Sequence, residues 1–114
     1  MKLVTKRVYD PPDSHDGVRV LVDRLWPRGL AKDKAALDHW IKEAAPSDEL
    51  RRWFGHDPAR WAEFRRRYRA EMAEHPEILA QLRGLTRGTL TLLFAAHDAE
   101  HNNAVALKEM LEEK

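Results

Sequence analysis

The chain has 114 residues and a formal net charge of +1, a size that fits one globular domain and a balance that excludes a polycation. Hydrophobic residues make up 43% of the sequence and charged residues 34%, which excludes a disordered chain. Cysteine is absent, so disulfides, thiol nucleophiles and thiolate metal sites are excluded.

Nothing in the sequence indicates export or a membrane. The longest apolar run, residues 89–96, is too short to span a bilayer, and no secretory signal follows Met1. We therefore expect a single domain over residues 1–114, located in the cytoplasm, with no membrane partner.

The first half of the chain predicts two strands and the start of a third. Residues 2–9 and 18–25 are rich in β-branched and aliphatic residues, and the turn residues of 10–17 separate them. About eight residues is short for a crossover between paired parallel strands, so these strands should be antiparallel or not neighbours. Residues 36–42 alternate in polarity, which favours a short strand.

The middle of the chain predicts two helices. Ser47 can cap the first and Gly55 can end it in a left-handed conformation. Asp57 and Pro58 begin the second, which Pro76 stops. Its apolar stripe repeats at helical spacing: Trp61, Phe64, Tyr68 and Met72.

The last third predicts a short helix that ends at Gly84, a buried strand over 89–96, and a final helix with Asp98 as its cap. Strands that alternate with helices indicate an α/β fold. We expect a small, mostly parallel sheet of three or four strands flanked by helices.

Polar residues follow the strands at 18–25 and 89–96. In open α/β sheets, ligands bind beyond the carboxyl ends of the strands. Arg24 and Arg28 are therefore candidates to bind phosphate or carboxylate, with Asp23 orienting one arginine and Trp26 forming a wall.

The segment before the last helix adds further candidates. His97 and His101 are candidate acid–base residues together with Asp23, and Asn102 and the free N–H groups of the first helical turn suit an anion. Two loop residues complete the expected site, in which Ser47 contacts the anion and His56 lines the pocket.

No metal or cofactor is expected. His97 and His101 are four residues apart, a spacing that presents two imidazoles to one metal when both lie on one helix face. If Asp98 caps the helix, His97 lies outside it and the two rings do not share a face.

Structural roles are the alternative for the same residues. Asp23 and Arg24 can pair with each other, Arg28 can cap a helix, and the polar residues at 97–103 can serve as caps.

Residues 51–69 contain seven arginines, which makes nucleic acid a further possible partner. Trp61 and Tyr68 could stack bases, but both belong to the apolar stripe, so nucleic acid is not favoured. A protein-interaction domain whose arginines are only surface is a third alternative.

Three motifs resemble the YeaO-like family, a set of small bacterial proteins with a domain of unknown function. They are VLVDRLWPRGL (20–30), APSDELRRWFGHDP followed by WAEFRRRY (45–68), and TLLFAAHDAEHNNAVAL (91–107). The resemblance implies a compact α/β domain of cytoplasmic type. Longer relatives have a Cys-His-Arg run after the last strand. Here His101, Asn102 and Asn103 occupy that region, so thiol chemistry does not transfer.

The sequence thus favours an anion-binding pocket at the carboxyl edge of the sheet, in an enzyme that acts on a small phosphorylated or nucleotide-like molecule. It leaves open the substrate, the reaction, the oligomeric state and whether the protein is an enzyme at all.

Overall fold

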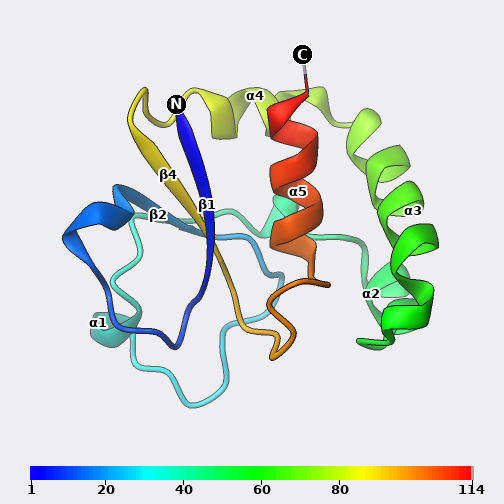
Figure 1. Cartoon of the computed structure of the whole chain (residues 1–114), viewed down its shortest axis with the longest axis horizontal. Helices are drawn as coiled ribbons and strands as arrows, with labels where there is room; N and C mark the ends of the chain where they lie inside the picture. The colour runs from blue at the N-terminus through cyan, green and yellow to red at the C-terminus, as the bar shows by residue number, and fades with distance from the viewer. Residues whose placement is uncertain (114) are drawn as a thin grey trace.

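Residues 1–113 are described by a computed structural model, in which four parallel strands form one sheet (Figure 1). The strands are β1 (Lys2–Arg7), β2 (Val18–Leu21), β3 (His39–Trp40) and β4 (Thr89–Phe94), in the order β1-β4-β2-β3. The helices are α1 (Lys32–Ala35), α2 (Asp48–Phe54), α3 (Trp61–Ala73), α4 (Pro76–Arg83) and α5 (Asn103–Glu112). The α/β fold expected from the sequence is confirmed.

The last strand lies between the first two. Leu92 of β4 is in register with Thr5 of β1 on one side and with Val20 of β2 on the other. The short connection between β1 and β2 therefore joins parallel strands that are not neighbours, one of the two arrangements that its length allows. β2 and β3 are shorter than expected and end at Leu21 and Trp40.

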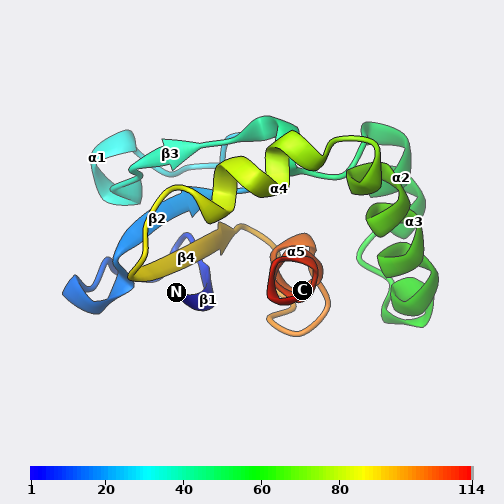
Figure 2. The ribbon, with the colours of Figure 1, turned by 90° about the horizontal axis from the view of Figure 1, so that it is seen from above.

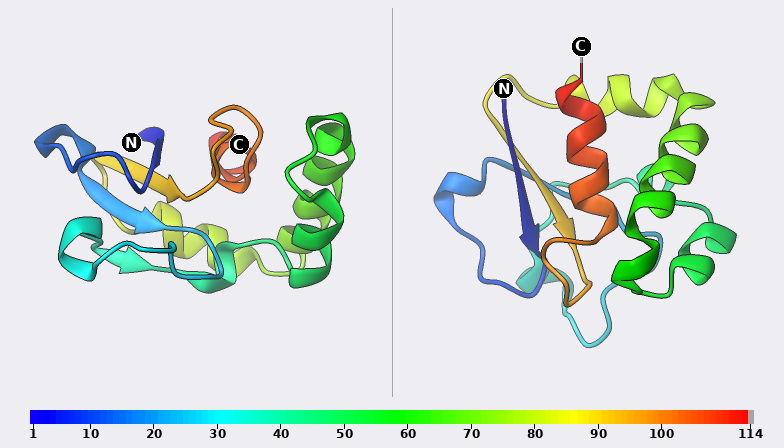
Figure 3. Two further views of the ribbon diagram at one scale, coloured as in Figure 1. Left: turned by 90° about the horizontal axis from the view of Figure 1, so that it is seen from below. Right: turned by 45° about the vertical axis from the view of Figure 1, so that its right-hand side comes forward.

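Alternation along the strands divides the core in two. Val20 and Leu92 point to the face that packs against α2 to α5, whereas Leu21 and Leu93 point to the face that packs under residues 26–40. Figures 2 and 3 show this arrangement, with the longer helices on one side of the sheet and α1 on the other. Both faces are covered, as is usual for a parallel sheet.

The helix boundaries follow local signals. The Ser47 hydroxyl accepts a hydrogen bond from the Leu50 backbone N–H, and Gly55 ends α2 with φ of 54°, as expected. Asp57 caps a 3-10 turn that Pro58 begins, and α3 starts after that turn, at Trp61.

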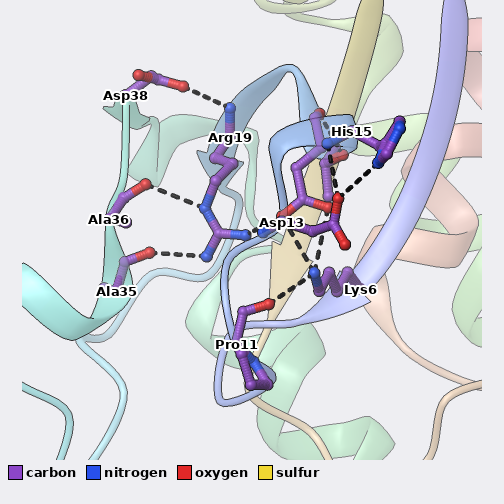
Figure 4. A network of polar contacts seen from close by, with 10 residues as sticks. Lys6, Pro11, Asp13, His15, Arg19, Ala35, Ala36 and Asp38 are labelled. Carbon is purple, nitrogen blue, oxygen red and sulfur yellow. Dashed lines mark hydrogen bonds and ion pairs between the residues drawn. The ribbon is translucent and has the colours of Figure 1, made fainter.

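A buried arginine ties the β1–β2 connection to the segment before β3 (Figure 4). Arg19 Nη1 lies 2.5 Å from Asp16 Oδ2, and its other nitrogens donate to the carbonyls of Ala35 and Ala36 at 2.7 and 3.0 Å. Ala36, whose carbonyl accepts from Arg19, has φ of 49°, a left-handed conformation that is uncommon for a residue with a Cβ. Lys6 also pairs with Asp16, at 3.1 Å.

None of the helices described over residues 1–113 is long and apolar enough to cross a membrane.

Candidate functional site

A cavity of about 570 Å³ opens at the carboxyl ends of β2 and β4, a size typical of small-molecule sites. It is lined by residues 23–28 after β2, by 95–98 after β4, by the start of α5, and by parts of α2 and α3. In Figure 1 and the right panel of Figure 3, the loops after β2 and β4 lie together at the lower edge of the molecule. Parallel neighbours bring these two segments to the same edge.

Asp23 joins the ends of three elements at this cavity. Its Oδ2 accepts from the Ala95 backbone N–H at 2.9 Å, and its Oδ1 accepts from Asn103 Nδ2 at 3.0 Å. Asn103 also donates to the Val22 carbonyl at 2.8 Å, so its amide joins β2 to α5. Burial raises the pKa of Asp23, and the bonds from Asn103 and Ala95 oppose this effect.

The expectation that Asp23 orients an arginine is wrong, as is the alternative that it pairs with Arg24. Both Asp23 oxygens bind N–H groups from Asn103 and Ala95 instead. The sequence does not show that Asn103 lies next to Asp23 in space. Arg24 was expected as the partner only because it is adjacent along the chain.

Two arginines on the cavity lining converge on a single carboxylate oxygen. Arg24 Nε lies 3.8 Å from Asp48 Oδ1, and Arg51 Nη2 lies 3.4 Å from the same atom. These distances are long for charge-assisted hydrogen bonds. Arg24 Nε also donates to the Pro46 carbonyl, at a long 3.4 Å, and the Asp48 side chain is half exposed. Neither guanidinium is therefore strongly held, and both retain free N–H donors.

Arg28 is exposed on the loop after β2 and lines the same cavity. Tyr9 donates to the Arg28 carbonyl at 2.8 Å, which fixes the loop against the end of β1. A smaller hollow of about 370 Å³ adjoins here, and its lining shares Arg28, Tyr9 and His97 with the main cavity.

Apolar and aromatic groups form much of the lining. Trp26 donates through Nε1 to the Leu30 carbonyl at 2.7 Å and meets Trp40 edge-on, which holds its ring in place. Phe54 and Phe64 stack with ring centres 4.3 Å apart at the side contributed by α2 and α3.

The last helix begins later than its sequence indicates. Asn102, not Asp98, is the cap of α5, and its Oδ1 accepts from the Val105 backbone N–H at 3.0 Å. Asp98 instead accepts from the Glu100 and His101 backbone N–H groups and from His101 Nδ1. Those bonds, of which the Glu100 N–H contributes most, lower the pKa of Asp98.

The cavity brings together most of the expected site residues: Asp23, Arg24, Trp26, Arg28, His56, His97 and Asn102. Ser47 and His101 are not on its lining. The Ser47 hydroxyl and backbone N–H both donate to Glu71, and His101 pairs with Asp98 and meets Trp61 edge-on at 5.3 Å. These contacts show that Ser47 is a cap residue and that His101 stabilises the turn before α5.

Sequence reasoning missed Arg51, Tyr9 and Asn103. A signal existed for Asn103, because asparagine is a poor helix former that needs a reason to lie in a first turn. Nothing in the sequence distinguishes Arg51 from the arginines around it.

A family model described as the inactive DUF488-N3 subclade matches residues 2–114. "Uncharacterized protein YeaO" of Escherichia coli (strain K12) is 45% identical over 112 residues, which cover 97% of each chain. The chain belongs to the YeaO-like family.

A second relative comes from Mycobacterium tuberculosis. "Uncharacterized protein Rv3073c" of Mycobacterium tuberculosis (strain ATCC 25618 / H37Rv) is 43% identical over 106 residues, which cover 92% of this chain and 89% of the relative. No solved structure matches the chain. The YeaO-like family match spans every segment that lines the cavity.

The arginines of the region 51–69 are largely engaged with acids. Arg66 and Arg67 both bind Glu63, at 2.7 and 2.9 Å, and Arg65 binds Glu109 at 3.2 Å. Arg69 pairs with Glu113. Tyr68 is fully buried in the core, and Trp61 packs half-buried against that core and stacks on Phe64 with ring centres 5.7 Å apart, so both rings are engaged within the protein.

We expect no appreciable affinity for single- or double-stranded DNA or RNA at physiological salt, because neutralised arginines release few counterions on binding. Fluorescence anisotropy against short oligonucleotide probes measures this. Tight, salt-sensitive binding that is lost when Arg65, Arg66 and Arg69 are changed to Gln would contradict the expectation.

Within residues 1–113, no group of three or more His, Cys, Asp or Glu side chains could hold a metal ion.

Proposed function

We propose that the cavity binds a small anionic molecule through a phosphate or carboxylate group. The observation that supports this best is the convergence of Arg24 and Arg51 on one oxygen of Asp48. Two guanidinium groups beside a single carboxylate leave excess positive charge and free donors at the cavity. An anion with several oxygens satisfies those donors better than the half-exposed carboxylate does.

The remaining charges on the lining also favour an anion. Arg28, His56 and His97 add cationic or neutral donors. Two acids, Asp23 and Asp98, also line the cavity, but they oppose anion binding less than two free carboxylates would. The oxygens of both acids already accept hydrogen bonds from N–H groups, which offsets part of their negative charge.

Binding without turnover is the form of this function that we favour. The matching subclade is described as inactive, and the chain has no cysteine for thiol chemistry. We expect AMP to be recovered unchanged after long incubation with the protein, and its conversion, detected by mass spectrometry, would indicate an enzyme.

Replacing either arginine tests the proposal directly. We expect Arg24→Met and Arg51→Met each to weaken AMP binding about 10- to 100-fold, because a hydrogen bond to a charged group contributes about 1.5–3 kcal/mol. Isothermal titration calorimetry measures the affinity. Thermal melts should change little, since both side chains are partly exposed.

Arg66→Met is the matched control, because Arg66 carries the same charge away from the cavity and pairs with Glu63. It should leave AMP affinity unchanged. The anion proposal fails if the wild-type protein binds neither AMP nor inorganic phosphate, or if Arg66→Met weakens binding as much as Arg24→Met does.

His56 provides a test in which binding and stability separate. It has φ of 57°, a left-handed conformation that is uncommon for a residue with a Cβ, and it lines the cavity. We expect His56→Gly to change the free energy of unfolding by no more than about 1 kcal/mol, because glycine adopts this φ freely. Affinity for AMP should fall severalfold with the loss of the imidazole donor.

His75→Ala is the control for this change, since His75 is also exposed but lies outside the cavity. Urea titration and calorimetry on the two variants give stability and affinity. Unchanged AMP affinity in His56→Gly would remove His56 from the site.

A further inference from the structure

Asp23 retains acceptor capacity at the cavity. A carboxylate has about four lone-pair sites, and each Asp23 oxygen accepts one hydrogen bond from the protein. One site therefore remains on each oxygen. Two adjacent acceptors on one planar group match two neighbouring hydroxyl groups, each of which donates one hydrogen bond.

The lining also offers an apolar surface beside these polar groups. Three large hydrophobic residues are exposed among residues 1–113, namely Met1, Tyr9 and Leu25. Two of them, Tyr9 and Leu25, line this cavity, and Leu25 is 60% exposed. Exposed apolar side chains that gather at one cavity indicate a ligand with an apolar part.

A matching ligand has three features: an anionic group for the arginines, neighbouring hydroxyls for the carboxylate, and an apolar, planar part for Tyr9, Leu25 and Trp26. A free phosphate or a simple carboxylate provides only the first. A phosphorylated ribose that carries a base provides all three in one molecule.

We infer that the cavity binds a ribonucleoside phosphate, with the ribose diol donating to Asp23, the phosphate on Arg24 and Arg51, and the base against Leu25 and Trp26. This inference rests on the proposed anion site and adds the ligand class. Asp23 would serve as an acceptor that selects the sugar, while Asn103 and the Ala95 N–H hold its carboxylate in place.

A ligand series on the wild-type protein tests the inference without any risk of misfolding. Calorimetry should give an affinity for AMP at least about 10-fold tighter than for 2′,3′-dideoxy-AMP, which keeps the phosphate and the base but loses two hydrogen bonds to Asp23. Ribose 5-phosphate, which keeps the phosphate and the diol, should bind more weakly than AMP because it lacks the base.

The Asp23→Asn variant provides the second arm. We expect it to lose the preference for AMP over 2′,3′-dideoxy-AMP and to keep binding that depends on Arg24. Equal wild-type affinities for these two nucleotides, with both reduced by Arg24→Met, would overturn the diol inference and leave the anion site standing. Absence of binding by AMP, ribose 5-phosphate and phosphate would overturn both.

Discussion

Gly17→Ala should reduce the free energy of unfolding by about 3–5 kcal/mol, because unfavourable backbone conformation and overpacking each cost about 1–3 kcal/mol. Gly17 has φ of 63° and ψ of −134°, a region that residues with a Cβ rarely adopt. A Cβ at this position would lie 2.8 Å from the Thr89 Cβ and closer still to the Thr89 carbonyl oxygen.

The clash lies where β2 meets β4, because Val18 pairs with Leu90 directly after this contact. The variant thus acts on the pairing that brings the two halves of the cavity together. Urea-induced unfolding measures the loss, which is a large share of the roughly 5–15 kcal/mol typical of a domain.

Gly29→Ala is the matched control. Gly29 also has a positive φ, 75°, but a Cβ at this position would have no atom within 4 Å. The variant should lose only about 1–2 kcal/mol, the conformational cost alone. Equal losses in the two variants would show that the contact with Thr89 does not contribute.

Arg19→Met should cost about 3–5 kcal/mol, because it breaks a buried ion pair and leaves carbonyl groups without donors (Figure 4). The Arg19 side chain is 6% exposed and donates to Asp16 and to the carbonyls of Ala35 and Ala36. Methionine keeps the apolar length of the side chain, so the effect reports on the polar contacts. Chemical denaturation measures it.

The same variant should alter the response to acid. Burial alone would raise the pKa of Asp16, but the Asp13 backbone N–H, Lys6 and Arg19 together lower it below the ordinary value of 3.8. A lowered pKa in the folded state adds stability above the ordinary pKa, which is lost as the pH falls through the folded value. Arg19→Met should therefore lose less stability than wild type between about pH 5 and 2, whereas an equal acid response would contradict this role.

Much of the fold could be predicted because its signals are local. Ser47 and Gly55 mark α2, and the apolar stripe that includes Phe64 and Tyr68 marks α3. The short connection after β1 excluded parallel pairing of β1 with β2, yet which strand lies between them depends on contacts distant in sequence. Only the structure identifies β4 as that strand.

The start of α5 shows where local signals compete. Asp98 and Asn102 are both good caps, and Asp98 bonds backbone N–H groups just as a cap does. Asn102 is the cap that the helix uses, and the first helical residue, Asn103, donates to the Val22 carbonyl and to Asp23. That contact joins residues far apart along the chain and has no local sequence pattern.

The position of the cavity could be predicted, but the pairings of the side chains around it could not. Because β2 and β4 are parallel neighbours, the polar residues that follow them lie at the same edge of the sheet. The partners of Asp23, and the convergence of Arg24 and Arg51 on Asp48, depend on how α2 and α5 pack beside that edge.

The most direct test of a ligand site in this cavity is a ¹⁵N–¹H NMR titration of the wild-type protein with AMP. We predict that shifts concentrate on the amides of residues 23–26, 28 and 95–103 and of Arg51 and His56. Arg24→Met should require a higher AMP concentration for the same shifts. Shifts confined to residues 65–69, which lie outside the lining, or no shifts at millimolar AMP, would contradict a ligand site in this cavity.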